Sequence, residues 1–212
     1  MKNRLRYNST AITLGALLAI LLASSVFGQG DKTTADVHNV TVGAFTVKVP
    51  TGWRSFSASE SELLRRQFMA QSEQIYRQYS NAKDPAGSVD IAAFHIAGDE
   101  GAFIIVSFTV PPQSDLINLL RSQAKDKMEW GIRQGYVKKD LGFVPLDYEQ
   151  LSGFCIKALG NDGAVQISGG MEHNKLKNTL VQLTLLCPKA WDELKATDTL
   201  TPILKSVTLR EK

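Results

Sequence analysis

Cysteine and histidine are scarce in this sequence, with two and three copies respectively in 212 residues. The sequence also contains no Cys-x-x-Cys, no His-Glu-x-x-His, no Gly-x-Ser-x-Gly and no Walker-type glycine loop. Those spacings bring metal ligands, nucleophiles or phosphate-binding amides together. From the motifs we therefore predict no catalytic residue, no metal ligand and no cofactor. The low cysteine count also excludes a dense disulfide framework.

The longest apolar run is also short, because Ala11–Ala23 has 13 residues, whereas a bilayer-spanning helix takes about 20. Three basic residues, Lys2, Arg4 and Arg6, precede this run. The segment Ser24–Gly28, which contains small residues, follows it. This arrangement predicts a secretory signal peptide over residues 1–28, cleaved so that the mature chain begins near Gln29. We therefore expect an extracytoplasmic protein, periplasmic or secreted, without stable membrane insertion.

The excess of positive charge is confined to the predicted leader. The whole chain has 24 Lys and Arg against 21 Asp and Glu, and its net charge is +3. Residues 1–28 hold three basic residues and no acidic one, which leaves 21 of each sign in the mature chain. A nucleic-acid-binding protein needs a surplus of cations to displace the counterions of phosphate. We therefore expect no nucleic-acid partner.

The mature chain predicts a polar, flexible lead-in over residues 29–39 and a single domain over residues 40–212. Apolar side chains alternate from Val40 to Val49, which indicates a strand, and Pro50–Gly52 ends it. Ser59 and Glu62 match a capping box that begins a helix. One apolar stripe follows along this helix, made of Leu64, Phe68, Ile75 and Tyr79.

The middle of the chain predicts a hairpin followed by a second helix. Strands over residues 89–96 and 102–110 flank a glycine-containing turn. The second of them contains Phe103–Val106, which is apolar on both pleat faces and therefore indicates a central strand covered on both sides. Ser114 is the expected cap of a helix that continues to about Gln134. Its apolar stripe consists of Leu116, Leu120, Ala124 and Met128.

The last third predicts three further strands over residues 151–159, 164–171 and 179–187. A helical segment begins at Pro188, a separate short helical turn covers Thr201–Lys205, and an edge strand is expected at residues 207–209. Together these elements predict an α+β fold with one mainly antiparallel sheet and helices on both of its faces.

Two stretches resemble the PsbP-like α/β/α superfamily. Phe45–Trp53 has the pattern Phe-x-Val-x-Val-Pro-x-Gly-Trp, similar to the strand and turn that open this fold, and Ile203–Val207 is similar to its closing helix-to-strand turn. The resemblance covers nearly the whole mature chain. The superfamily includes photosystem II subunits, a Ran-binding import factor and exported bacterial envelope proteins. The resemblance implies an α/β/α sandwich that binds other proteins; it implies no reaction and assigns no functional residue here.

The residues that could carry chemistry are dispersed. His38, His95 and His173 lack the spacing of metal ligands. Asp90 and His95 lie five positions apart in one strand, so we expect them on opposite faces. The adjacent carboxylates Asp99 and Glu100 are expected at a wet hairpin tip, and Trp53 is expected to close the core rather than to form an exposed stacking platform.

Cys155 and Cys187 leave two alternatives open. Export favours a disulfide. If the turn at residues 160–163 sets the strand register, however, Cys155 faces Ser168, Ser168 faces Gln182, and Cys187 lies well beyond bonding reach. The predicted meander therefore favours two free, buried thiols.

We therefore expect an exported, non-enzymatic protein of the cell envelope or its exterior. It would bind another extracytoplasmic protein or a small ligand through one side of the sheet. Two alternatives stay open. An enzyme with a site built from dispersed residues would show a deep pocket with strongly shifted pKa values. An assembly or stress accessory factor that holds client proteins would show a broad apolar groove.

Overall fold

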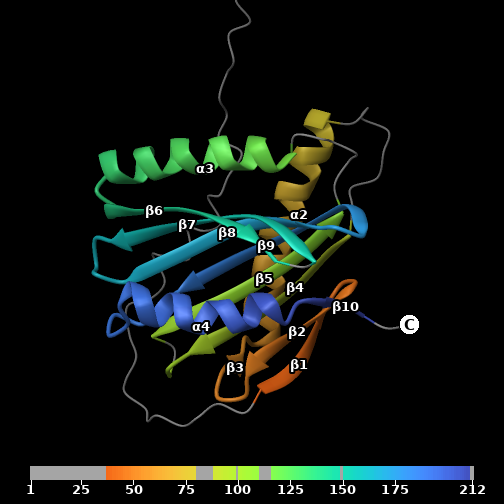
Figure 1. Ribbon diagram of the computed structural model, residues 1–212, viewed down its shortest axis with the longest axis horizontal. Coiled ribbons are helices and arrows are strands. Elements are labelled where there is room, and N and C mark those ends of the chain that lie inside the picture. Colours follow the sequence, from red (N-terminus) through yellow and green to blue (C-terminus); the bar gives the residue numbers. More distant parts are fainter. Residues whose placement is uncertain (1–36, 80–87, 99, 110–115, 149, 211–212) are drawn as a thin grey trace, which may run out of the picture.

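The computed structural model describes residues 37–79, 88–98, 100–109, 116–148 and 150–210. Its largest element is a seven-stranded antiparallel sheet (Figure 1). The strands in spatial order are β3 (Arg54–Ser55), β4 (Val89–Ile96), β5 (Gly101–Thr109), β9 (Leu176–Leu186), β8 (Val165–His173), β7 (Leu151–Gly160) and β6 (Val137–Asp147).

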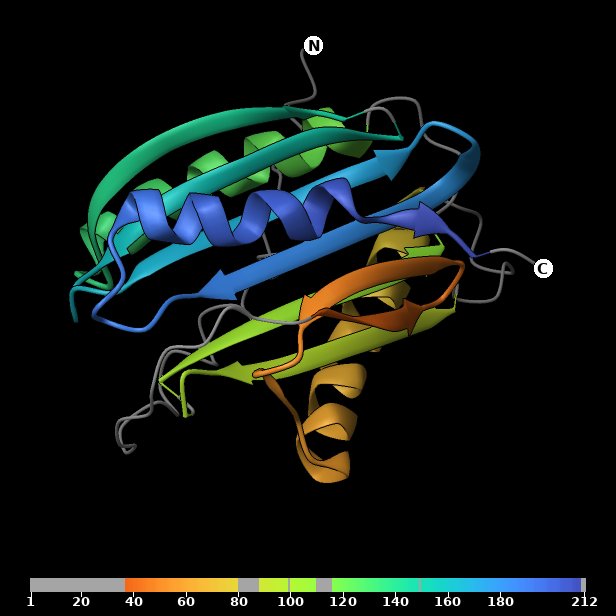
Figure 2. The ribbon, with the colours of Figure 1, turned by 60° about the horizontal axis from the view of Figure 1, so that its bottom comes forward.

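Both faces of this sheet are covered (Figure 2). One face, here called the helical face, packs against α2 (Ala58–Tyr79) and α3 (Leu116–Arg133). The other, here called the mixed face, packs against α4 (Glu193–Lys205) and a small sheet. The small sheet consists of β1 (Val37–Val42), β2 (Phe45–Pro50) and β10 (Thr208–Leu209), with β2 in the middle. The predicted α+β architecture, with helices on both faces of an antiparallel sheet, is confirmed.

β5 is an interior strand of the large sheet, between β4 and β9, and both of its faces are buried. Phe103 and Ile105 belong to the core of the mixed face, whereas Ile104 and Val106 belong to the core of the helical face. None of these four side chains is more than 1% exposed. The prediction of a central strand covered on both sides is confirmed. Trp53 is half-buried, and its ring centroid lies 5.5 Å from that of Phe103, so it packs on the core as expected.

The cap of α2 differs from the predicted one. The Ser57 N–H donates to Glu60 Oε2 at 2.8 Å, and the Glu60 N–H donates to Ser57 Oγ at 3.3 Å. This reciprocal pair is a capping box, and it lies two residues before the expected pair of Ser59 and Glu62. Glu62 instead accepts hydrogen bonds from two arginines one turn further along the helix, Arg65 and Arg66.

The apolar stripes of α2 and α3 are confirmed where they are described. Leu64 and Phe68 of α2 are buried, and so are three side chains of α3: Leu120, Ala124 and Met128. The side chains of Ile75, Tyr79 and Leu116, and the whole of Ser114, lie outside the described part of the chain.

The edge strand β6 was not predicted. Its first half exposes Lys138, Lys139 and Asp140, and the register with β7 shifts between Val137 and Lys139 and again between Asp140 and Gly142. These irregularities remove the alternation of apolar and polar residues that identifies a strand in a sequence. Sequence patterns therefore gave no signal for this element.

The ends of the domain also differ from prediction. β1 begins at Val37, which pairs with Pro50, so the last three residues of the expected lead-in belong to a strand. α4 is one continuous helix with Pro202 inside it, rather than two pieces, and Asp192 Oδ1 caps it by accepting the Lys195 N–H at 2.8 Å. Residues 1–36, with the expected signal peptide, lie outside the described residues.

The register of the last hairpins is shifted from the predicted one. Cys155 faces Gly169 rather than Ser168, and Ser168 faces Thr184 rather than Gln182. The pairing of β7 with β8 is offset from the predicted register by one residue, and that of β8 with β9 by two. Turn residues in a sequence show where a turn lies, but they do not fix which residues pair in the strands beyond it. Both cysteines are buried and free in the structure.

Candidate functional site

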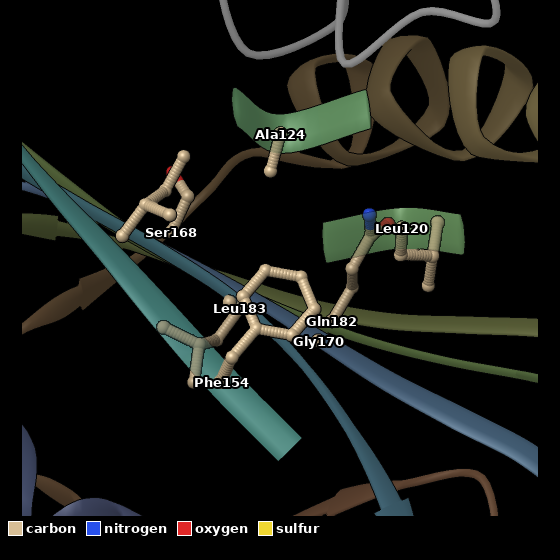
Figure 3. A pocket seen from close by; sticks show the side chains of 9 residues that line it. Leu120, Ala124, Phe154, Ser168, Gly170, Gln182 and Leu183 are labelled. Carbon is tan, nitrogen blue, oxygen red and sulfur yellow. The ribbon is translucent and has the colours of Figure 1, made fainter. Parts of the chain in front are cut away.

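A small cavity lies between α3 and the helical face of the sheet (Figure 3). Its volume of about 10 Å³ suits a single water molecule, so it is too small for an organic ligand. The residues that line it come from α3, β7, β8 and β9: Leu120, Ala124, Phe154, Ile156, Ser168, Gly169, Gly170, Gln182 and Leu183.

The polar lining of this cavity comes from neighbouring positions of β8 and β9. Gln182 lies opposite Gly170, and Ser168 lies opposite Thr184. Ser168 and Gln182, which line the cavity, are both buried, and Gln182 Oε1 has no hydrogen-bond partner. An unsatisfied buried polar atom carries a cost of about 1–3 kcal/mol. One water molecule is the partner for which the cavity has room.

A second feature of the helical side is a cation held over aromatic rings. The guanidinium carbon of Arg121, on α3, lies 5.1 Å from the ring centroid of Phe143 and 5.8 Å from that of Phe154. The two phenylalanines, from β6 and β7, stack with centroids 5.1 Å apart. One helical turn beyond Arg121, Lys125 Nζ lies 5.8 Å from the Phe143 centroid. We call Arg121 and Lys125 the cationic pair.

The charges of the cationic pair are not compensated within the described chain. Neither residue forms a salt bridge there, and the nearby Glu129 pairs with Arg133 at 3.8 Å. Arg121 Nε is buried and has no hydrogen-bond partner. Like charges one turn apart on a helix repel each other. The pair therefore presents donors and positive charge to whatever approaches this side of α3.

The end of α3 exposes aromatic surface. Trp130 and Tyr136, each 42% exposed, pack together with ring centroids 5.6 Å apart and ring planes tilted by 35°. We call these two residues the aromatic pair. Ile132, in the last turn of α3, is 43% exposed. Large aromatic side chains that are partly exposed are enriched at protein–protein contacts. Trp130 follows Arg121 by nine positions, about half a turn around the helix, so the aromatic pair and the cationic pair lie on opposite flanks of α3.

The comparisons with known proteins concern the fold. No family model matches the sequence, and no curated protein matches it. The solution structure of cyanobacterial PsbP from Synechocystis sp. PCC 6803 matches 86% of this chain and 98% of its own, with a TM-score of 0.51 and 11% identity. The chain has a PsbP-like fold. The Ran-binding protein Mog1p of Saccharomyces cerevisiae matches 83% of this chain and 96% of its own, at 14% identity and a TM-score of 0.45.

The PsbP-like fold keeps the three histidines apart. No group of three or more His, Cys, Asp or Glu within the described residues could hold a metal ion. His38 packs edge-on against Phe94, with ring centroids 6.1 Å apart. His95 stacks on Phe56, and its Nε2 lies 3.2 Å from Glu60 Oε1. A side-chain hydrogen bond from Ser57 is the main cause that lowers the pKa of Glu60. The contacts of His95 with Phe56 and Glu60 connect the start of α2 to β4 of the large sheet.

The carboxylates named by the sequence do not form a site. Asp90 lies next to Gly43 of the small sheet, and His95 contacts α2, so the two residues occupy opposite faces as predicted. Glu100 is exposed, and Asp99 lies outside the described residues. The cationic pair and the aromatic pair were both missed by the sequence analysis.

His173 is buried at the end of β8 and has a defined tautomer. Its Nδ1 accepts the Lys175 N–H at 3.0 Å, which places the ring proton on Nε2, 3.4 Å from Gln150 Oε1. Its ring centroid lies 5.5 Å from that of Phe45. Burial lowers the pKa of His173, and the positive charge of Lys175 lowers it further.

We expect this buried histidine to make the protein less stable in mild acid. Because its folded-state pKa lies below 6.5, the unfolded chain binds more protons just below that pH, so stability falls as the pH drops. His173→Asn should be less stable than the wild type at about pH 7.5, and it should lose less stability on going to about pH 5.5. Urea unfolding at the two pH values measures this difference. Equal losses in both proteins would contradict the assignment.

Proposed function

We propose that this protein is exported and acts outside the cytoplasm as a non-enzymatic module that binds another protein through the outer side of α3. The observation that carries the proposal is the exposed aromatic pair at the end of that helix. None of the described helices is long and apolar enough to cross a membrane. The predicted signal peptide supports export.

A protein partner fits the structure better than a small ligand does. The cavity beneath α3 has room for about one water molecule. Trp130, Ile132 and Tyr136, in contrast, are all more than 40% exposed on the surface. Aromatic side chains of this kind supply most of the binding energy at protein interfaces.

A non-enzymatic role is supported by the ionisable groups. The pKa shifts large enough to quantify belong to Cys155 and Cys187, and burial raises each of these pKa values to about 12. A nucleophilic cysteine needs the opposite shift, because the thiolate is its reactive form. Burial also raises the pKa of Glu172, but among the described residues it has no ion-pair partner that could act as a second group in acid–base catalysis.

The test is capture of partners from the protein's own extracytoplasmic fraction. The chain is expressed with its natural leader and purified from that fraction, and N-terminal sequencing shows whether it begins near Gln29. We expect Trp130→Ala combined with Tyr136→Ala to reduce capture of a specific protein by about tenfold or more. A matched control removes exposed leucines from the other helices, Leu63→Ala on α2 with Leu194→Ala on α4, and should capture as the wild type does.

Three results would contradict the proposal. The first is a protein that keeps its leader and stays in the cytoplasm or the membrane. The second is a captured set that is the same for the wild type and for the aromatic variant. The third is a turnover activity that survives purification to homogeneity. Circular dichroism of each variant shows that a loss of capture is not a loss of fold.

A further inference from the structure

We propose that the cationic pair recognises a carboxylate of the partner protein, within a segment rich in aspartate or glutamate. This inference rests on the proposed function, because it takes a protein partner at α3 as given and names what that partner presents to the flank opposite the aromatic pair. It assigns Arg121 and Lys125 as binding residues. Phe143 is their positioning residue, since its ring lies close to both cations.

Arg121 is held in place before any partner arrives. Its guanidinium lies over two stacked rings, from Phe143 and Phe154. Such contacts with aromatic rings favour a fixed side chain. A fixed arginine loses little conformational entropy when it forms hydrogen bonds, and its fork of N–H donors matches the two oxygens of a carboxylate.

The site also lacks the counter-ion that such a pair of cations needs. Lys125 brings a second positive charge to the same ring, and no acidic side chain of the described chain pairs with either cation. The Arg121 Nε–H has no acceptor and is buried, so an anion would approach the rest of this partly exposed side chain. An anion that contacts both residues would relieve their repulsion and supply hydrogen-bond acceptors. Aspartate and glutamate are the anionic side chains that an unmodified protein partner carries.

The adjoining surface indicates the form of the partner. Ile132 follows Lys125 by seven positions, so it lies on the same side of α3, and it is 43% exposed. An acidic segment with an apolar residue would therefore contact both. Addition of the segment to β6 as a further strand is disfavoured, because two register shifts and exposed charges interrupt that edge. The segment would bind through its side chains.

The experiment uses a fluorescein-labelled peptide of alternating glutamate and serine and the purified mature protein. We expect fluorescence anisotropy to show binding that weakens as salt is added, because ions screen exposed charges. Arg121→Gln combined with Lys125→Gln should reduce the affinity about tenfold or more. Arg121→Lys keeps the charge and loses the planar fork, so it should fall between this variant and the wild type. A peptide of alternating glutamine and serine should not bind.

A charge-matched control separates the site from net charge. Lys189→Gln combined with Lys205→Gln removes two exposed cations from the region of α4 and changes the net charge equally. This variant should bind the peptide as the wild type does. In the ¹⁵N-labelled wild type, the Nε–H resonance of Arg121 should shift during the titration. That signal reports contact at the guanidinium and does not depend on how stable a variant is.

Several results would overturn the inference. They are an absence of peptide binding, equal losses in the two double variants, equal binding of the glutamine peptide, or a response of the Arg121 resonance to inorganic phosphate but not to the peptide. Capture of the partner distinguishes this failure from that of the proposed function. If Arg121→Gln with Lys125→Gln still captures the partner and the aromatic variant does not, the proposed function stands and the carboxylate site is wrong.

Discussion

Gly169→Ala should destabilise the protein by about 3 kcal/mol, whereas Gly170→Ala, at the next position of β8, should change its stability by less than about 1 kcal/mol. The two glycines point to opposite faces of the sheet. A Cβ at position 169 would lie 2.4 Å from Phe154 O and 2.6 Å from Cys155 Sγ. The first of these atoms belongs to the backbone of β7 and cannot move without disturbing the ladder.

The environment of Gly170 is different. A Cβ there would meet Leu120 Cδ1 and Phe154 Cε1 at 3.6 Å, which is ordinary van der Waals contact. The added methyl group would enter the cavity beneath α3, where its new contacts offset the loss of the water molecule that the cavity has room for, and it displaces no protein atom. Both variants replace a glycine of β8 by alanine. The difference between their free energies of unfolding therefore reports how closely β7 and β8 approach each other at Gly169.

Urea unfolding followed by circular dichroism measures both free energies of unfolding. A loss of about 3 kcal/mol is a large part of the 5–15 kcal/mol that a typical domain has. Equal stabilities of the two variants would mean that β8 can move away from β7 at no cost. The register in which Cys155 faces Gly169 would then be wrong.

Alkylation of Cys155 and Cys187 should be about a thousandfold slower in the native protein than in the denatured one. Burial raises the pKa of each thiol from its ordinary 9.0 to about 12. The thiolate is the nucleophile, and at a pH below 9 its fraction falls about a thousandfold with such a change. Steric exclusion slows the reagent further, since both side chains are at most 3% exposed.

After denaturation without reductant, mass spectrometry should find two alkylated cysteines. Cys155 faces Gly169, which faces Leu183, and Cys187 lies four residues beyond Leu183, directly after the end of β9. Four residues of strand span about 13 Å, and the two strand spacings add about 10 Å across the sheet. A disulfide needs Cα atoms within about 7 Å. An intact bridge between these residues would contradict the strand order, and rapid native alkylation would contradict their burial.

The core was predictable from the sequence because burial leaves a local pattern. Phe103–Val106 is apolar at every position, which identified β5, and the spacing of Leu120, Ala124 and Met128 identified the inner side of α3. The predicted cap of α2 was two residues too late, because the sequence contains two Ser-x-x-Glu pairs, Ser57 with Glu60 and Ser59 with Glu62. The first pair is favoured by a tertiary contact: Phe56, just before α2, stacks on His95 of β4, and His95 also contacts Glu60.

The candidate site was not predictable in the same way. Arg121 and Lys125 carry one weak signal, since no acidic residue lies three or four positions from Arg121. Both cations lie over the ring of Phe143, which belongs to β6. The register shifts of β6 remove the alternation by which a strand is recognised in a sequence. Trp130 and Tyr136 meet because the chain turns at Gly135, where φ is +75°. The contacts of the cationic pair depend on a pairing across elements, which no single stretch of sequence encodes, and the contact of the aromatic pair depends on the conformation of one turn.

The small sheet joins the two ends of the described chain and so constrains when the fold can be completed. β10 pairs with β2, the Arg210 N–H donates to Ala44 O at 2.9 Å, and the Lys48 N–H donates to Ser206 Oγ across 158 residues of sequence. Contacts between such distant residues form late and slow folding. Until residues 206–210 have been synthesised, Phe45 and Val47 lack the part of their cover that this segment supplies. The core of the mixed face therefore stays incomplete until residues 206–210 have joined β2.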